Sequence, residues 1–411
     1  MKMRYNSAMM KVKTLIVGGG AAGLYLATKL NDKSNILLVE RGERLGRKLA
    51  ATGNGQGNVT NVHLSADHYF TFENAERKKI KGILTAYGYL EKLAFLESLG
   101  GLFTADERGR VYPTSRQASA VTDLLRFEIE RSNVNVMLSS KVTRLQKTRD
   151  GFIVKLSTPD GEKEIQAQTV VLCAGGKAAK NFGTDGTGYE LATSLGHTLT
   201  PLYPSLVQLK TDAKETKTLK GIRVMDACVR ACKGEKELAR MQGDVIFTEY
   251  GISGDVVFRL SSFISKDAEK GDVRCYIDFI PEISAEKLTS ILERKQRCGK
   301  FERSELLCGI LNNQVGRLVM KRSGTIEDVV KNVKNFCVTV TGTLGYDYAQ
   351  VTQGGVKLSE LDENLQSKKV SGLYFAGEII DVDGECGGYN LQWAYSSAAT
   401  VAAEINGQKK E

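Results

Sequence analysis

Residues 12–23 read VKTLIVGGGAAG, and this short stretch decides the fold of the chain. An apolar run with β-branched residues predicts a strand over 12–17, and the segment that follows Gly23 has helical spacing. The pattern Gly18-x-Gly20-x-x-Gly23 stands between the two. A second apolar run, NILLVE, ends in Glu40, about 20 residues further on. Strand, glycine turn, helix, strand and acid together predict a dinucleotide-binding βαβ unit.

Each glycine of this first glycine turn (residues 18–23) has an expected role. Gly18 permits the tight turn, Gly20 lets a diphosphate approach the backbone, and Gly23 lets the helix pack closely on the strand. The helix N-terminus offers free N–H groups to the phosphates, and Glu40 would accept hydrogen bonds from the adenosine ribose. A glycine pattern alone is weak evidence for a binding site. Its place between a strand and a helix, with an acid at the expected distance, favours a binding site over an ordinary turn.

A second glycine-rich stretch near the C-terminus indicates which dinucleotide is bound. GLYFAGE (372–378) predicts a strand followed by Gly377 and by Glu378, which would bond a sugar-like hydroxyl. DVDGECGGYNLQWAYSSAATVA (381–402) then predicts a helix from about Tyr389, with two glycines baring its first amides. A flavin needs such a second contact because its ribityl chain and ring extend beyond the first βαβ unit. The helix N-terminus would stabilise the negative charge of reduced flavin by roughly 0.5–2 kcal/mol.

Composition excludes several classes of protein. The 411 residues suggest two or three domains, and 57 basic against 48 acidic residues give a net charge of +9. No stripe of Lys and Arg interleaved with aromatics is present, so no nucleic-acid partner is expected. The sequence shows neither a secretion signal nor a long apolar run, and its eight cysteines form no metal signature. We expect a cytoplasmic protein without a metal site or a membrane span, acting on a small molecule, and the oligomeric state stays open.

Periodicity predicts that one domain is split by insertions. Residues 134–173 alternate with period two and predict a meander with Asp-Gly hairpin turns. Short alternating segments over 200–283 predict a small β-barrel, and 284–322 is charged and helical throughout. The last 60 or so residues return to the style of the first domain. The predicted domains are a FAD-binding domain over 1–198 and 345–411, a β-barrel over 199–283 and 324–344, and a helical insert over 284–323.

Several longer motifs resemble a known family. GRKLAATGNGQGNVTN, GRVYPTS, VLCAGG, FTEYGISG and GLYFAGEIIDVDGECGGYNLQWAYSS are similar to motifs of the bacterial FAD-dependent flavoproteins that include aminoacetone oxidase and the bile-acid 3-dehydro Δ4/Δ6 reductases. The resemblance spans most of the chain. It implies an α/β fold with a split FAD-binding Rossmann domain of the glutathione-reductase type, an inserted β-barrel domain and a small helical insert.

The resemblance also implies a set of FAD contacts. Together with Gly18, Gly20, Gly23 and Gly377 of the two glycine stretches, the predicted cofactor-binding residues are Ala21, Ala22, Glu40 at the ribose, Arg47, Lys48 and Gly53 along the diphosphate and ribityl chain, Asn58 in the following loop, Val142 at adenine through its backbone, Glu378, Asn390 and Leu391. For Arg47 and Lys48, a solvated basic pair is the alternative interpretation. We expect a single non-covalent FAD.

Two stretches depart from the family pattern. Relatives usually have Gly-Arg-Cys-Asn where this chain has Gly-Gln-Gly-Asn at 55–58, so the loop lacks a cation and a thiol. Relatives also have Phe-Thr-His-x-Gly-Ile-Ser-Gly-Pro where this chain has FTEYGISGD at 247–255. If the imidazole handles a proton in relatives, this protein must use another group or a different substrate.

The candidates for proton transfer are Tyr250, Glu249 and Tyr389, for each of which packing or exposure is the alternative. No second GxGxxG follows a strand, so NAD(P)H would act as a transient electron donor. The leading hypothesis is an FAD enzyme that reduces an activated C=C bond of a hydrophobic ketone with NAD(P)H, through flavin N5. The alternatives are an oxidase of a small amine or amino ketone that uses oxygen, and an FAD-binding module without turnover, attached to RNA.

Overall fold

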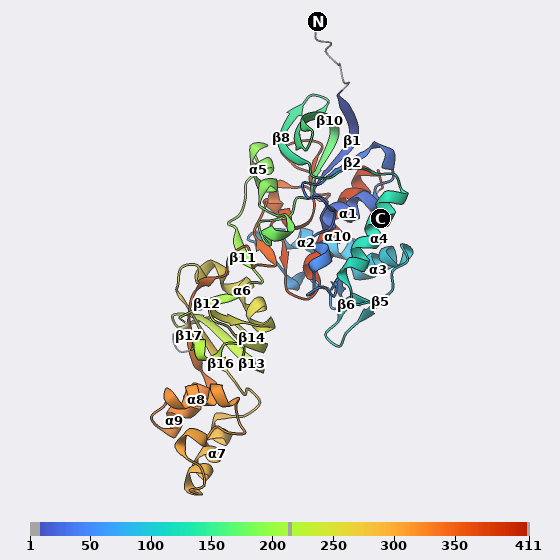
Figure 1. The fold of residues 1–411 in the computed structure, drawn as a ribbon. Helices are drawn as coiled ribbons and strands as arrows, with labels where there is room; N and C mark the ends of the chain where they lie inside the picture. Colours follow the sequence, from blue (N-terminus) through green and yellow to red (C-terminus); the bar gives the residue numbers. More distant parts are fainter. Residues whose placement is uncertain (1–8, 213–215, 409–411) are drawn as a thin grey trace. The chain divides into compact units, whose positions relative to one another are not determined.

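The computed structural model describes residues 9–212 and 216–408, and it divides the chain into two compact units (Figure 1). The first unit comprises Met1–Leu202 and Val351–Glu411, and the second comprises Tyr203–Gln350. The first unit therefore ends at residue 202 and resumes at 351, where the sequence had placed these boundaries at 198 and 345. No helix within the described ranges is long and apolar enough to cross a membrane.

A seven-stranded sheet with the order β7-β2-β1-β10-β9-β8, in which β19 also pairs with β10, forms the centre of the first unit. Its strands are β1 (Met10–Val17), β2 (Ile36–Val39), β7 (Asn135–Met137), β8 (Lys141–Thr148), β9 (Gly151–Thr158), β10 (Gly161–Leu172) and β19 (Leu373–Phe375). β7, β2, β1, β10 and β19 run parallel, while β8, β9 and the first half of β10 form an antiparallel meander. The sequence assigned all of 134–173 to the meander, and this was wrong for β7, which pairs with β2 instead.

Strand β10 brings the N-terminal and C-terminal parts of the chain together, because it pairs with strands from both. Its outer half pairs with β9 and begins with four exposed residues, whereas its last three residues are all buried. That buried end, Val170–Leu172, pairs with Leu373–Phe375 of β19 on one side and with β1 on the other. β10 therefore lies between β19, which precedes the second glycine-rich stretch, and β1, which precedes the first glycine turn.

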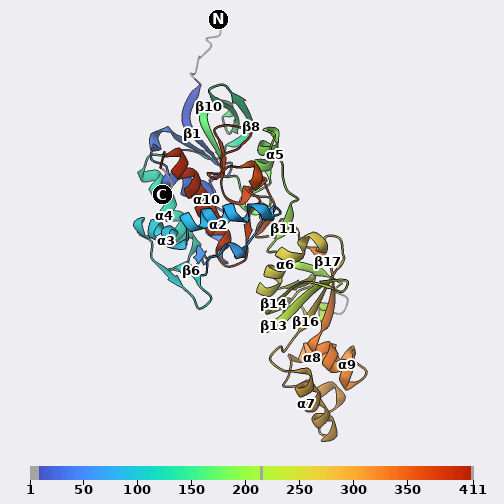
Figure 2. The same ribbon diagram turned by 180° about the vertical axis from the view of Figure 1, so that it is seen from behind.

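Helices cover the sheet and bury the tail of the chain. The helices of this unit are α1 (Ala21–Lys29), α2 (Arg77–Ala86), α3 (Tyr89–Ser98), α4 (Ala118–Arg131), α5 (Thr187–Ser194) and α10 (Tyr389–Ile405). α10 is buried on almost all sides, and its buried polar residues Gln392, Ser396 and Thr400 form hydrogen bonds within the helix. It packs beside α1 (Figure 1), and Tyr395 meets Tyr25 edge to face with ring centroids 5.1 Å apart. The view from behind shows α2 on another side of α10 (Figure 2).

Short strands support the loops around the site. β3 (Thr60–Asn61) pairs with β6 (Arg110–Pro113), which pairs with β5 (Phe103–Ala105). β20 (Asp383–Gly384) pairs with β4 (Tyr69–Phe70) and carries the acidic part of the tail motif. Two further short strands are β11 (Tyr203–Ser205) and β18 (Val351–Gln353).

The second unit is a closed barrel with the strand order β12-β15-β14-β13-β16-β17. Its strands are β12 (Leu209–Thr211), β13 (Arg223–Lys233), β14 (Lys236–Phe247), β15 (Gly251–Ser253), β16 (Val273–Asp278) and β17 (Phe336–Thr343). The sequence missed helix α6 (Asp255–Ala268), which packs on the barrel through Val256, Leu260 and Ile264. Strand-like segments on both sides of it concealed its helical spacing.

The helical insert is longer and less regular than the sequence suggested. It contains α7 (Ala285–Arg297), α8 (Asn313–Lys321) and α9 (Ile326–Lys334), so it extends past residue 323 into the stretch assigned to the barrel. Between α7 and α8 only a short 3-10 turn at Arg303–Glu305 is formed. α9 begins at Thr325, whose side chain accepts a hydrogen bond from Asp328 N in a reciprocal capping box.

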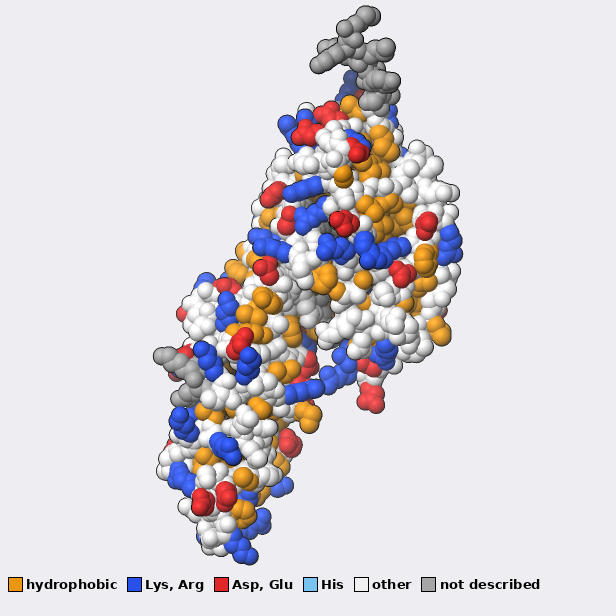
Figure 3. Space-filling model, in the orientation of Figure 1, with side chains coloured by type: hydrophobic (Ala, Val, Ile, Leu, Met, Phe, Trp, Pro, Cys, Tyr) orange, Lys and Arg blue, Asp and Glu red, His pale blue; other side chains and the backbone are white. Residues whose placement is uncertain are grey.

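On the face drawn in Figure 3, Lys and Arg side chains are scattered among acidic and hydrophobic ones in both units. The net positive charge is therefore distributed over this face rather than concentrated in one stripe.

Candidate functional site

The three glycines of the first glycine turn have different surroundings. Gly18 has a φ of 106°, and a Cβ there would lie 2.6 Å from the carbonyl oxygen of Cys173. A Cβ on Gly23 would lie 1.9 Å from Gly18 O, so only glycine lets α1 start this close to the strand. A Cβ on Gly20, by contrast, would meet no atom within 4 Å. The turn is closed on the protein side and open at Gly20, which suits a diphosphate.

Electrostatics at this turn also suit an anion. Gly20 is the N-cap of α1 and has no side chain to occupy the first amides, and the first helical turn contains no acidic residue. The partial positive charge of the helix N-terminus is therefore left for a ligand. Glu40 accepts hydrogen bonds from Gly19 N (2.7 Å) and Gly42 N (2.6 Å), one on each oxygen. Each oxygen keeps a further lone pair with which to accept from a ribose hydroxyl.

The tail segment comes into direct contact with this turn. Gly377 has a φ of 80°, and a Cβ on it would lie 2.8 Å from Cβ of Ala22. Its amide donates to Ser397 Oγ (2.9 Å), and its carbonyl accepts from the indole of Trp393 (3.2 Å), so α10 holds it in place. Residues that are more than 350 positions apart in the sequence thus lie against each other at one site.

Lys48 and Glu378 form an ion pair beside this contact. Lys48 Nζ lies 2.7 Å from Glu378 Oε2, and Glu378 Oε1 accepts from Thr352 N at 2.9 Å. Thr352 Oγ1 in turn accepts from the amides of Lys177 and Ala178 (2.8 and 3.0 Å), which follow the glycines of VLCAGG. The structure therefore brings two predicted site residues together and supports them with a third segment.

The N-terminus of α10 presents free amides. Gly387 and Gly388 have φ values of 126° and 100°, and a Cβ on Gly388 would lie 2.4 Å from Thr60 O. Gln392 N is the first amide bonded within the helix, to Gly388 O at 2.9 Å. The amides of Tyr389, Asn390 and Leu391 precede it and have no helical acceptor. The Asn390 side chain makes two hydrogen bonds to the backbone of Gly384: its Oδ1 accepts from Gly384 N at 2.8 Å, and its Nδ2 donates to Gly384 O at 2.6 Å.

The other predicted cofactor residues also lie in the first unit. Arg47 donates to Asn181 O at 2.8 Å, and Gly53 is exposed with a φ of 58°. Asn58 is buried, and its amide donates to Thr60 O and Val111 O (3.2 and 3.1 Å), so its side chain joins β3 to β6. Val142 is buried in β8 next to a register shift. For these four residues, as for all the other predicted cofactor residues, contact with FAD stays a prediction.

Tyr389 lies in a cluster that the sequence did not reveal. Its ring stacks on the imidazole of His68, with centroids 4.4 Å apart, and Tyr69 OH donates to its carbonyl at 2.9 Å. His68 Nδ1 lies 3.2 Å from Glu385 Oε2. Burial and the nearby Glu385 carboxylate raise the pKa of Tyr389 to about 12, so its hydroxyl keeps its proton at neutral pH. His68 is of interest because of its contact with Tyr389. No sequence pattern around His68 could have predicted that contact.

Glu249 and Tyr250 lie in the second unit, between β14 and β15. Lys220 Nζ pairs with Glu249 Oε2 at 2.6 Å and lowers the pKa of that exposed carboxyl. A carboxylate held in its charged form is a poor proton donor at neutral pH. Tyr250 accepts a hydrogen bond from Thr211 N at its backbone oxygen. A role for either side chain in proton transfer stays a prediction, and the ion pair of Glu249 argues against it.

Two acidic residues of the tail motif are buried. Asp381 accepts from Thr71 Oγ1 and Phe72 N (3.0 and 2.9 Å), and burial raises its pKa to about 7. Asp383 is only 1% exposed, and burial together with the neighbouring carboxylates of Asp381 and Glu378 raises its pKa well above the ordinary value. The raised pKa values mean that these two carboxyls resist ionisation. Within the described residues, no group of three or more His, Cys, Asp or Glu side chains is placed to hold a metal ion.

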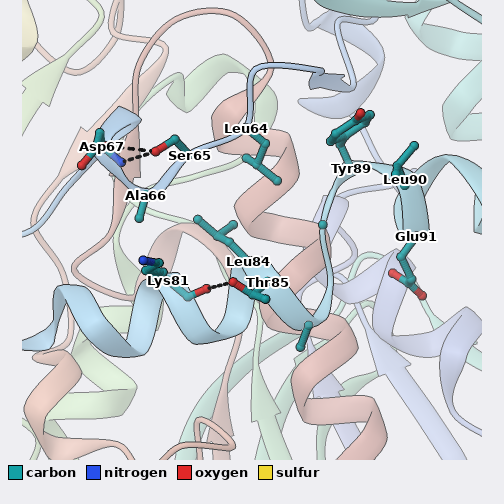
Figure 4. Close-up of a pocket in the computed structure, with 12 residues that line it drawn as sticks. Leu64, Ser65, Ala66, Asp67, Lys81, Leu84, Thr85, Tyr89, Leu90 and Glu91 are labelled. Carbon is teal, nitrogen blue, oxygen red and sulfur yellow. Dashed lines mark hydrogen bonds between the residues drawn. The ribbon is translucent and has the colours of Figure 1, made fainter. Parts of the chain in front are cut away.

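A separate pocket of about 540 Å³ lies between the loop Leu64–Asp67 and the facing ends of α2 and α3 (Figure 4). Leu64 and Leu84 contribute apolar surface, while Lys81 and Glu91 are charged residues of its lining. None of the predicted cofactor or catalytic residues lines it. This pocket is therefore distinct from the two glycine-rich segments.

The fold and the site define an FAD-dependent oxidoreductase with a Rossmann-type FAD-binding domain and a closed six-stranded barrel. The chain belongs to the HI0933-like protein Rossmann domain family, which it matches over residues 12–404.

Known relatives extend over almost the full length of the chain. It is 36% identical to the 3-dehydro-bile acid delta(4,6)-reductase of Clostridium scindens, covering 95% of this chain and 98% of the relative. It is 27% identical to the ribosomal RNA dihydrouridine synthase of Haemophilus influenzae, covering 96% and 99%. The 3-ketosteroid delta1-dehydrogenase from Sterolibacterium denitrificans shares the fold, with a TM-score of 0.54, 13% identity and coverage of 97% and 100%.

Proposed function

We propose that this protein reduces a C=C bond conjugated to a carbonyl group in a hydrophobic ketone, with NAD(P)H as the electron donor. The observation that carries the proposal is the 36% identity, over 95% of the chain, to a reductase whose name specifies a dehydro bile acid. The open glycine turn and the free amides of α10 supply the cofactor site that such a reaction needs. FAD is therefore the group that the two ends of the chain bind together.

Different residues would hold different parts of FAD. The first glycine turn and the N-terminus of α1 suit the diphosphate, and Glu40 suits the adenosine ribose. Lys48 and Glu378 offer a cation and an acceptor for the diphosphate and the ribityl hydroxyls. The first amides of α10 suit the electron-rich pyrimidine end of the ring. When bound, FAD supplies the hydride that is transferred through N5.

The chain itself has to place the substrate and hold a proton. Reduction of a conjugated C=C bond adds a hydride to one carbon and a proton to its neighbour, while NAD(P)H is oxidised to NAD(P)⁺. The Tyr389 hydroxyl stays protonated at neutral pH and stands beside the His68–Glu385 pair, so it is our proposed proton donor. Its place at the start of α10 puts it next to the proposed ring site.

Anaerobic stopped-flow absorbance tests the reaction. Flavin bound to the protein should be bleached by NADH or NADPH and should regain its colour when a steroidal enone is added. A flavin that neither nicotinamide reduces would refute the proposal. Rapid peroxide formation with an amino ketone, without reoxidation by the enone, would favour the oxidase alternative instead.

A second candidate substrate is a uracil base in RNA. Uracil has a C5=C6 bond conjugated to its C4 carbonyl, so the same hydride and proton addition gives dihydrouridine. The similarity to the Haemophilus influenzae synthase and the net charge of +9 favour this candidate, although the sequence has no basic–aromatic stripe. Parallel assays of the reduced enzyme with a steroidal enone and with unmodified ribosomal RNA would separate the two. Reoxidation by RNA alone, weakened by salt, would replace the ketone with RNA as the substrate.

A further inference from the structure

Lys92 of α3 is completely buried, with 0% of its surface exposed. Its Nζ donates to the carbonyl oxygens of Val59 (2.6 Å) and Leu391 (2.7 Å). The same atom lies 5.1 Å from the ring centroid of Tyr25 and 5.7 Å from that of Tyr395. Lysine is almost never fully buried without a partner charge, because removing an ammonium from water is costly. Burial also lowers the pKa of Lys92 well below its ordinary value.

The two carbonyl acceptors belong to two segments of the proposed cofactor site. Leu391 lies in the first turn of α10, and Val59 directly precedes β3 in the loop that follows Gly53. These segments pack backbone against backbone, since a Cβ on Gly388 would lie 2.4 Å from Thr60 O. The side chain of Thr60 also donates to Gln392 Oε1 at 2.6 Å. Lys92 therefore joins the helix N-terminus to the loop at the point where both would meet the flavin.

Burial disfavours the positive charge of Lys92, and its direct contacts act against this effect. Two carbonyl oxygens and two aromatic faces are the electron-rich groups that stabilise a buried ammonium. A cation at this place adds to the partial positive charge at the N-terminus of α10. Inside a protein, where the effective dielectric is low, such a charge acts more strongly than in water. Because reduced flavin carries more negative charge than oxidised flavin, the cation favours the reduced form.

We propose that Lys92 is a positioning residue of the cofactor site, whose ammonium holds the first turn of α10 against residues 58–60 and favours binding of reduced over oxidised flavin, an inference that rests on the proposed FAD site. The proposal assigns a role to a side chain that neither glycine motif contains.

Lys79 of α2 provides a matched control. It is also buried, at 6% exposed, and its Nζ also donates to two carbonyl oxygens, those of Leu358 (3.0 Å) and Leu361 (2.8 Å). It pairs with Glu76 at 2.9 Å. Neither of its carbonyl acceptors belongs to a predicted cofactor-binding residue. Lys79→Met and Lys92→Met therefore each remove a buried lysine bonded to two carbonyl oxygens, and Lys79→Met also removes an ion pair.

The test measures the midpoint potential of bound flavin by redox titration and the Kd for oxidised FAD by fluorescence. For Lys92→Met we expect about a tenfold lower preference for reduced over oxidised flavin, which equals a midpoint about 30 mV lower for a two-electron couple. For Lys79→Met we expect the same potential as the unchanged protein, whatever its loss of thermal stability. Lys92→Gln keeps amide donors but no charge and should also lower the potential, while binding oxidised FAD more tightly than Lys92→Met.

An unchanged midpoint potential in a folded Lys92 variant would overturn the proposal. An equal shift in Lys79→Met would overturn it as well, because the effect would then come from general destabilisation. The outcome is separate from that of the proposed reaction. A protein that binds FAD but reduces no enone would refute the reaction, and the potentials of the two lysine variants would still decide the role of Lys92.

Discussion

Replacing Gly20 with valine should weaken FAD binding strongly and leave the fold intact. The backbone of Gly20 has a φ of −77°, which valine adopts freely, and a Cβ there meets no protein atom within 4 Å. Loss of glycine at this N-cap should cost about 1 kcal/mol, a small part of the roughly 5–15 kcal/mol that stabilises a typical domain. The branched side chain would instead fill the space proposed for the diphosphate.

The loss of affinity can be worked out from the contacts removed. A hydrogen bond to a charged group contributes about 1.5–3 kcal/mol, and valine at this place would block roughly two amides. We therefore expect FAD binding to weaken by roughly 10²–10⁴-fold. The assay is a fluorescence titration of the apoprotein with FAD, together with circular dichroism to verify the fold.

Gly82→Val is the control for this experiment. Gly82 lies in α2, is exposed and also has nothing within 4 Å of its Cβ position, so this variant should keep both fold and affinity. A folded Gly20→Val protein that binds FAD as tightly as the unchanged chain would refute the assignment of the diphosphate site.

Three further predictions follow from other contacts. Gly23→Ala should lower the melting temperature and the yield of folded protein, because its Cβ would lie 1.9 Å from Gly18 O; normal melting would contradict this packing. Burial raises the pKa of Asp381 from 3.8 to about 7, so this group resists ionisation in the folded state and its contribution to the free energy of unfolding falls as pH rises from about 4 to 7. In Asp381→Asn this decrease in the free energy of unfolding, up to about 4 kcal/mol, should be absent from denaturant titrations across this pH range. If the pH profile of the variant equals that of the unchanged protein, the pKa of Asp381 is not raised. Lys48→Met should leave Glu378 without its ion-pair partner and weaken FAD binding by about tenfold in the same fluorescence titration, and an unaltered Kd would exclude Lys48 from the site.

The sequence predicted those parts of the site that depend on local backbone geometry. The strand, glycine turn and helix around Gly18, Gly20 and Gly23 are where the pattern indicated. A positive φ restricts Gly18 and close packing restricts Gly18 and Gly23, whereas Gly20 is open. The contact between the two ends of the chain was expected from the cofactor that both would bind. The structure shows it directly, as Gly377 against Ala22.

The sequence could not reveal residues whose importance comes from distant contacts. His68 and Lys92 lie in segments without a motif, and their partners Tyr389 and Leu391 are about 300 positions away. Asp383 was overlooked because burial, the first cause of its raised pKa, cannot be read from the local sequence. Helix α6 was missed for a different reason, since strand-like segments on both sides of it concealed its helical spacing.

Hydrogen exchange with and without FAD tests most directly whether both ends of the chain hold one cofactor. We expect FAD to protect the amides of residues 18–23 and those of residues 387–391, with the same half-saturating FAD concentration for both segments. Protection of only one segment, or protection of the two at clearly different FAD concentrations, would contradict a single shared site.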